Sequence, residues 1–147
     1  MGYLELAVKE LRRIDTDLQV SPVYESAPLG GPDGQSKYLN CVVALETDLG
    51  ARQVLDVAHS IEAMAGRVRT VRNGPRTLDV DVLLMGDLRI SEPDLVVPHP
   101  RLAERGFVLA PLEDIDPALV PADWRERLAS RAPASLDLRL VGTLEDS

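Results

Sequence analysis

The chain has 147 residues and a net charge of −8, with 45% hydrophobic residues. This is enough for one domain with a core, and the acidic balance argues against nonspecific nucleic-acid binding, which requires Lys and Arg to neutralise phosphates. No apolar stretch approaches the length of a membrane span. The one cysteine, Cys41, rules out an intrachain disulfide and lies in an apolar alternating run that is typical of packing residues. We therefore expect a cytoplasmic monomer with neither nucleic-acid nor membrane partners.

The first half of the chain alternates between helical and extended patterns. Residues 3–14 are predicted to form an amphipathic helix because apolar side chains recur three and four positions apart. A strand is predicted over 18–26, at a sheet edge, because Pro22 has no N–H for a ladder. Residues 27–37 form a loop rich in Gly and Pro, whose composition fits a functional loop and a tolerated insertion equally well. A second strand follows over 38–47.

The second half begins with a helix over 51–65, and a basic linker over 66–75 leads into a strand over 77–85. The remaining predicted elements are short: a tight turn at 86–87, helices at 101–105 and 122–130, and a strand at 136–144. The order predicts an α+β sandwich with helices on one face of a mostly antiparallel sheet. It matches the ferredoxin-like βαββαβ pattern with its first strand missing. We expect one domain over 1–147, with its core in 3–120 and an extension over 121–147.

Two carboxylates on the predicted strand 77–85 carry the clearest chemical signal. Asp79 and Asp81 share one face of the strand, because side chains alternate along it. Divalent cations relieve their repulsion, since Mg²⁺ takes one or two carboxylates and completes its shell with water and phosphate oxygens. A pair of such ions can clamp a polyphosphate for in-line displacement. A bare Asp-x-Asp is more often just an acidic exposed face.

The basic linker before the acidic pair makes metal binding a better interpretation than an acidic exposed face. Four arginines precede the acidic pair, at positions 67, 69, 72 and 76. Arginine forks bind phosphate oxygens bidentately, although taken alone the group would be read as a solvated charged loop. Arginines directly before a convergent acidic pair, in an acidic protein, favour phosphoryl-transfer chemistry.

The run Gly-Pro-Arg-Thr-Leu-Asp-Val-Asp-Val-Leu-Leu at 74–84 resembles the signature of the hydroxymethyldihydropterin pyrophosphokinases. The resemblance covers about residues 3–120. Further segments agree with it in order and spacing: Pro-Leu-Gly at 28–30, Tyr-Leu-Asn at 38–40, Ile-Glu at 61–62, Gly-Arg-Val-Arg at 66–69, Val-Pro-His-Pro-Arg at 97–101 and Arg-Gly-Phe at 105–107.

The resemblance implies an ATP-dependent diphosphotransferase of folate biosynthesis. It implies transfer of pyrophosphate from ATP, the co-substrate, to 6-hydroxymethyl-7,8-dihydropterin with release of AMP. Asp79 and Asp81 would hold two Mg²⁺ ions, while Arg67 and Arg76 would bind phosphates and stabilise charge during transfer. The implied ATP contacts are Glu62 near the ribose and adenine, Arg69 and Arg72 on a mobile loop, His99 and Arg105. The implied pterin slot is built by Leu29, Tyr38, Asn40, which hydrogen-bonds the pterin edge, and Phe107, which stacks on the ring.

Four of these residues have ordinary structural interpretations as well. Asn40 fits a satisfied strand edge, His99 a surface turn, Phe107 a core position and Glu62 a solvated helix face. Taken from the residues alone, those interpretations remain open for each of them.

The chain departs from the family pattern in three places. Asn73 stands where an aromatic is common, and His59 where a Gln is common. The family also opens with a strand and a Gly-Ser-Asn turn, whereas this chain starts at the following helix. We expect a start assigned too far downstream; a truncated form, or replacement of the strand by residues 136–141, are the alternatives.

Two other functions fit parts of the pattern. A truncated, non-catalytic homologue that binds nucleotide or pterin is the alternative to an active enzyme. A different two-metal enzyme on a ferredoxin-like palm, such as a nucleotidyl transferase or cyclase, would also use Asp-x-Asp. The Gly-Pro-Arg run and the charge of −8 speak against that third interpretation.

Overall fold

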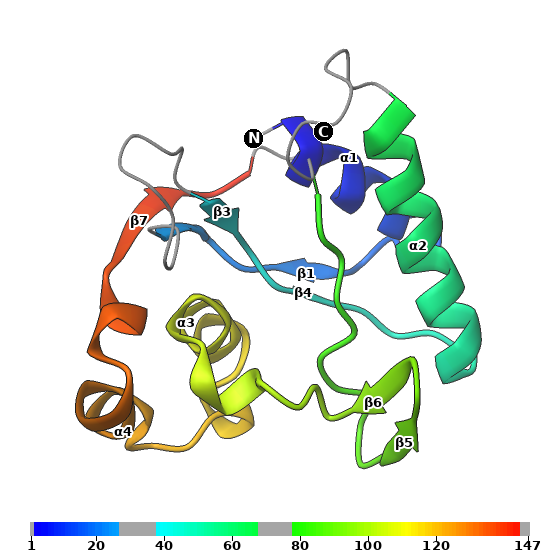
Figure 1. The fold of residues 1–147 in the computed structure, drawn as a ribbon. Helices are drawn as coiled ribbons and strands as arrows, with labels where there is room; N and C mark the ends of the chain where they lie inside the picture. The colour runs from blue at the N-terminus through cyan, green and yellow to red at the C-terminus, as the bar shows by residue number, and fades with distance from the viewer. Residues whose placement is uncertain (1, 27–37, 68–77, 145–147) are drawn as a thin grey trace. The chain divides into compact units, whose positions relative to one another are not determined.

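The computed structural model describes residues 2–26, 38–67 and 78–144, and shows an α+β fold with small antiparallel sheets (Figure 1). The chain divides into two compact units. Unit 1 contains residues 17–45 and 101–147, and unit 2 contains residues 2–16 and 46–100. Within the described ranges, no helix combines the length and apolar character that crossing a bilayer requires.

Unit 1 is built on short antiparallel strands. Its three-stranded sheet has the order β3-β2-β7, and β1 pairs with β4 in a separate two-stranded ladder. Tyr24 lies opposite both Asn40 and Leu140 in this register. The strand bounds are β1 Gln19–Val20, β2 Val23–Ser26, β3 Tyr38–Asn40, β4 Val43–Ala44 and β7 Leu138–Gly142.

The predicted edge position of the first strand was wrong for β2, which lies in the middle of its sheet. The predicted strand over 18–26 is divided at Ser21 and Pro22, so the proline falls between β1 and β2. At this break the Ser21 N–H donates to the Val42 carbonyl at 2.8 Å, and the Val42 N–H donates to Ser21 Oγ at 2.8 Å. Pro22 therefore removes no donor from the central strand.

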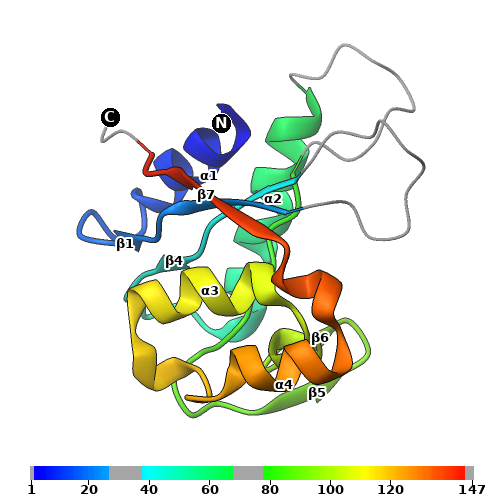
Figure 2. The ribbon, with the colours of Figure 1, turned by 90° about the vertical axis from the view of Figure 1, so that its left-hand side faces the viewer.

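Helices cover one side of this sheet. α3 (Gly106–Ile115) packs against β2 and β3, and α4 (Trp124–Arg131) lies beside α3 (Figures 1 and 2). The buried side chains include Val23, Leu109 and Trp124, each exposed by 2% or less. Three 3₁₀ turns connect these elements: η1 Leu102–Glu104, η2 Pro117–Leu119 and η3 Pro133–Leu136. The predicted helix at 122–130 and strand at 136–144 are confirmed as α4 and β7.

Unit 2 contains the two predicted N-terminal helices, α1 (Gly2–Leu11) and α2 (Ala51–Arg67), which pack together. Ile61 and Ala65, on the inner face of α2, are exposed by only 1% and 0%. A hairpin of β5 (Ile90–Glu92) and β6 (Leu95–Val97) completes the unit. Leu95 and Val97 of the hairpin form a core with Ala51, against which Leu55, Val82, Met85 and Ile90 pack.

The predicted strand over 77–85 was wrong within the described residues, because 78–85 form no ladder and are drawn as a plain trace between α2 and β5 (Figure 1). Two of its backbone groups have partners of another kind. The Val80 N–H donates to Glu62 Oε2, and the Leu83 carbonyl accepts from the His99 N–H. The turn predicted after it is confirmed: Leu88 N donates to Met85 O at 3.0 Å around Gly86, whose φ of 57° suits glycine.

Candidate functional site

The acidic pair lies on an exposed segment of unit 2. Asp79 and Asp81 are exposed, while Leu78, Val80 and Val82 are half-buried. This alternation is what an extended backbone produces when every second side chain points to the same side. Both carboxylates therefore face solvent, and a hydrated cation can reach them.

Glu62 is joined to the backbone between those two aspartates. Its Oε2 accepts the Val80 N–H at 2.7 Å, a bond that links α2 to the acidic segment across 18 residues of sequence. Glu62 is half-buried, so its interpretation as a fully solvated helix residue does not hold. Sequence reasoning missed this bond, because nothing in the residue pattern pairs a helix carboxylate with one backbone N–H.

His99 lies beside the same segment. Its backbone N–H donates to the carbonyl of Leu83 at 2.9 Å, two residues beyond Asp81. Its side chain is half-buried. The structure thus brings the backbone of His99 close to the acidic segment, and a nucleotide contact by its ring stays a prediction.

The donor chemistry of the acidic pair fits magnesium better than a softer metal. Over the parts of the chain that the structure describes, no group of three or more His, Cys, Asp or Glu side chains could hold a metal by itself. Two exposed carboxylates offer only hard oxygen donors. Mg²⁺ is held in this way, by one or two carboxylates with water and substrate phosphate oxygens completing the shell.

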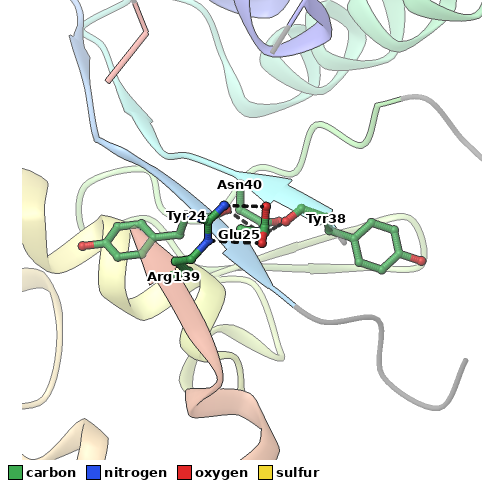
Figure 3. Close-up of polar contacts among 5 residues, drawn as sticks. All are labelled: Tyr24, Glu25, Tyr38, Asn40 and Arg139. Atoms are coloured by element: carbon green, nitrogen blue, oxygen red, sulfur yellow. Dashed lines mark hydrogen bonds and ion pairs between the residues drawn. The ribbon is translucent and has the colours of Figure 1, made fainter. Parts of the chain in front are cut away.

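Asn40 is held firmly in unit 1, at the end of β3 (Figure 3). Its Nδ2 donates to Ser26 Oγ at 3.0 Å and lies 3.4 Å from the carbonyl oxygens of Tyr24 and Tyr38. These contacts fix the carboxamide so that its N–H groups face the protein. No described residue donates to Oδ1, which is left as an acceptor for a ligand N–H.

Tyr38 and Tyr24 extend to opposite sides of the Asn40 position (Figure 3). Tyr38 is 55% exposed, so it offers an uncovered ring. Across the sheet, Arg139 of β7 pairs with Glu25 of β2 at 3.3 Å, which ties the C-terminal strand to the one beside Asn40.

Phe107 and Arg105 meet at the start of α3. The guanidinium carbon of Arg105 lies 5.6 Å from the centroid of the Phe107 ring, which is a cation–π arrangement. Both side chains are half-buried, so Phe107 is not a fully enclosed core residue. The residue predicted to contact ATP and the one predicted to stack on the pterin therefore touch each other.

Ser135 fixes the start of α3 and was missed by sequence reasoning. Its Oγ accepts the Gly106 N–H at 2.6 Å, satisfying one of the free donors at the helix N-terminus. A Cβ on Gly106 would come within 2.1 Å of the Ser135 carbonyl oxygen, so only glycine fits between Arg105 and Phe107. Ser135 thereby helps to fix the backbone positions of Arg105 and Phe107.

The remaining predicted site residues lie outside the described part of the chain. They are Leu29, Arg69, Arg72, Arg76 and the side chain of Arg67, of which the structure describes only the helical backbone. The described site residues fall into different units: Glu62, Asp79, Asp81 and His99 belong to unit 2, and Tyr38, Asn40, Arg105 and Phe107 to unit 1.

Cys41 follows Asn40 directly and is half-buried. Burial raises the pKa of its thiol to about 11. The protonated thiol therefore dominates near neutral pH, which suits the packing role expected from the sequence and not that of a nucleophile.

Comparison with known proteins gives a consistent result. The sequence model of the 7,8-dihydro-6-hydroxymethylpterin-pyrophosphokinase family matches residues 1–117. The 2-amino-4-hydroxy-6-hydroxymethyldihydropteridine pyrophosphokinase of Pseudomonas aeruginosa is 48% identical over 106 residues, which cover 72% of this chain and 65% of that relative. The protein of the same name from Bacillus subtilis is 44% identical over 115 residues, covering 77% of this chain and 68% of the relative. The mitochondrial folate synthesis bifunctional protein of Arabidopsis thaliana is 47% identical over 95 residues, covering 65% of this chain and 17% of that protein.

Proposed function

The chain belongs to the 7,8-dihydro-6-hydroxymethylpterin-pyrophosphokinase family, and from this premise we propose that it transfers pyrophosphate from ATP to 6-hydroxymethyl-7,8-dihydropterin. The pterin hydroxyl oxygen forms a bond to the β-phosphorus of ATP as the hydroxyl loses its proton. The bond from that phosphorus to the oxygen bridging to the α-phosphate breaks, and AMP leaves with this oxygen. The observation that carries the proposal is the exposed Asp79 and Asp81 pair within the matched residues.

The carboxylates of unit 2 prepare the phosphate side of the reaction. We propose that Asp79 and Asp81 hold two Mg²⁺ ions, which when bound neutralise phosphate charge and polarise the β-phosphorus. The side chains of Arg67 and Arg76 would bind phosphate oxygens and stabilise charge during transfer, with Arg69 and Arg72 closing over the nucleotide. His99 and Arg105 would contact ATP. Positioning and electrostatics supply the catalysis in this scheme.

The side chains of unit 1 prepare the pterin side. Because Nδ2 of Asn40 is bonded to the protein, its Oδ1 would accept an N–H from the pterin edge. Phe107 would stack on the pterin ring, with Arg105 on the Phe107 ring. Tyr38 and Leu29 would line the slot. We also propose a ferredoxin-like arrangement for the α+β fold of this chain.

The experiment that tests the function is AMP release by the purified chain. We expect AMP and pterin diphosphate in equal amounts when ATP, Mg²⁺ and the pterin alcohol are all present, and no AMP when the alcohol is omitted. Calorimetry with each substrate is the companion measurement. Binding of ATP and pterin without AMP would support the non-catalytic homologue, and polymerisation of nucleotide alone would support a nucleotidyl transferase.

Substitution of Asn40 should weaken pterin binding selectively. Asn40→Ala removes Oδ1, and we expect the KM for the pterin to rise by about 10- to 100-fold, the range of one unpaired polar contact. The KM for ATP should stay within about twofold, because Asn40 is not among the residues proposed to contact ATP. Steady-state kinetics with each substrate varied in turn measures this. A Ser26→Ala variant is the control, since it removes one partner of Nδ2 and leaves Oδ1 in place. Equal effects on both substrates would rule out the pterin contact.

A further inference from the structure

Glu62 is the described site residue whose side chain bonds to the backbone between Asp79 and Asp81. It lies between Ile61 and Ala63 on α2, and four buried side chains of the described part of that helix anchor it in unit 2: Ala51, Ala58, Ile61 and Ala65. From this fixed base the carboxylate reaches the Val80 N–H at 2.7 Å. The distance is that of a charge-assisted hydrogen bond, which is stronger than a bond between neutral groups.

The accepted N–H has a particular position. Val80 is the single residue between Asp79 and Asp81, and residues 78–85 have no neighbouring strand within the described parts of the chain to hold their backbone. Fixing the N–H of Val80 fixes the plane of the peptide that joins it to Asp79. That plane sets the backbone direction at Asp79 and Val80, and in an extended segment the side chain of Asp81, two positions after Asp79, lies on the same side as that of Asp79.

We propose that Glu62 is a positioning residue that holds the two aspartate carboxylates on one side of the segment by accepting the Val80 N–H. It is not required to touch metal or nucleotide in this role. Its consequence for catalysis rests on the proposed function, because the aspartates bind Mg²⁺ only if that assignment holds. The role differs from the ribose contact that the family resemblance implies for the same residue.

Two substitutions separate acceptance of a hydrogen bond from charge. Glu62→Gln keeps an acceptor oxygen and loses the negative charge, whereas Glu62→Ala loses both. Asp56→Ala is the matched control, since it removes another carboxylate from α2 at an exposed position. Thermal unfolding of each variant shows how much of any effect is general stability.

The first measurement does not depend on activity. Amide hydrogen exchange at Val80, followed by NMR on the full-length ¹⁵N-labelled chain, should be at least about tenfold faster in Glu62→Ala than in the parent. Exchange in Glu62→Gln and Asp56→Ala should remain within about threefold of the parent. An unchanged Val80 amide in Glu62→Ala would overturn the proposal.

The second measurement is the Mg²⁺ concentration that gives half-maximal AMP release. We expect Glu62→Ala to raise it by about 10- to 100-fold, the usual cost of losing a group that orients a metal ligand. Glu62→Gln should stay near the parent, and the KM for ATP at saturating Mg²⁺ should not change in either variant. A raised KM for ATP in both variants would instead indicate the ribose contact. An equal rise in the half-maximal Mg²⁺ concentration in both variants would indicate that the charge of Glu62 matters. Either result would overturn the proposal that Glu62 is a positioning residue.

The two measurements test the proposed function and the positioning role of Glu62 separately. If the parent chain releases no AMP, the proposed function is wrong, and the exchange of the Val80 amide still decides whether Glu62 holds the segment. If the parent is active and Glu62→Ala leaves the exchange rate of the Val80 amide unchanged, the proposed function stands and the positioning role of Glu62 is wrong.

Discussion

Asp81→Asn should lower kcat/KM for AMP release by on the order of 10²–10³-fold, the usual cost of removing one preorganised group that stabilises charge. The substitution keeps the shape of the side chain and removes its negative charge. Asp81 is exposed, so the neutral amide leaves no buried charge behind and the fold should be unaffected. The loss should appear in the Mg²⁺ dependence, because a carboxamide is a weaker ligand for a hard cation than a carboxylate. Coupled measurement of AMP against Mg²⁺ concentration is the assay.

Asp87→Asn is the matched control for this variant. Asp87 is also an exposed aspartate and lies only six positions further along the chain, in the turn after Met85. Its substitution should leave kcat/KM within about twofold of the parent, as expected for an exposed residue away from the site. Parent-like activity in Asp81→Asn would end the assignment of the acidic pair to metal binding. A similar loss in both variants would point to general charge and not to a site.

Helices with a clear amphipathic period were predicted well from the sequence. Helix α3 shows why a helix without such a period was not predicted. Leu4, Ala7 and Val8 identified α1, and α2 was found nearly to its end. The helix Gly106–Ile115 was not predicted, because its middle residues 109–112 are all buried and apolar and therefore show no polar face. Pro111 lies inside it as well, and proline normally marks the end of a helix.

Strand prediction failed where the formation of a strand depends on a neighbouring strand. Residues 77–85 have the alternation and β-branched residues of a strand, and the described part still shows exposed aspartates alternating with half-buried apolar residues. A strand requires a neighbour to complete its ladder, and propensity alone cannot supply one. The hairpin of β5 and β6 had a readable signal in Pro93-Asp94 between two short runs, since proline presets the first position of a turn.

Within the candidate site, the sequence pointed to candidate site residues but not to the groups that form hydrogen bonds with them or with the backbone beside them. Asp79 and Asp81 were proposed from their type and spacing and Asn40 from the family resemblance, and their roles stay predictions. The groups that orient them, Glu62 on Val80 and Ser26 on Asn40, come from positions 18 and 14 residues away in the sequence. Tertiary packing selects such partners, so a pattern read along one chain carries no mark of them.

Trp124→Ala should be the most destabilising of the substitutions considered, with a loss of about 3–5 kcal/mol in the free energy of unfolding. The side chain is 2% exposed, and its Nε1–H donates to Glu113 Oε2 at 3.2 Å. Arg125 stacks over the indole at 4.2 Å and donates to Glu113 Oε1 at 3.0 Å. These two donors, Arg125 first, hold the pKa of Glu113 below its usual range. The indole thus fills the core and completes a polar cluster on α3.

The assay must not rely on indole fluorescence, because Trp124 is the single tryptophan of the chain. Urea unfolding followed by far-UV circular dichroism compares the variants instead. Trp124→Phe keeps most of the apolar volume and loses the donor to Glu113, so its cost should be nearer about 1–2 kcal/mol. Leu119→Ala is the control from the same segment: Leu119 is 40% exposed, and its loss should change stability by no more than about 0.5 kcal/mol.

The result also decides what the residues after the family match contribute. The match ends at residue 117, whereas α4, Ser135 and β7 all follow it. If Trp124→Ala unfolds unit 1, the segment is part of the same core as α3, and pterin affinity should fall with it because α3 carries Phe107. A Trp124→Ala variant as stable as Leu119→Ala would mean that α4 lies on the molecule without supporting it. The positions of Arg105 and Phe107 would then depend on Ser135 and on the strands packed against α3, and not on α4.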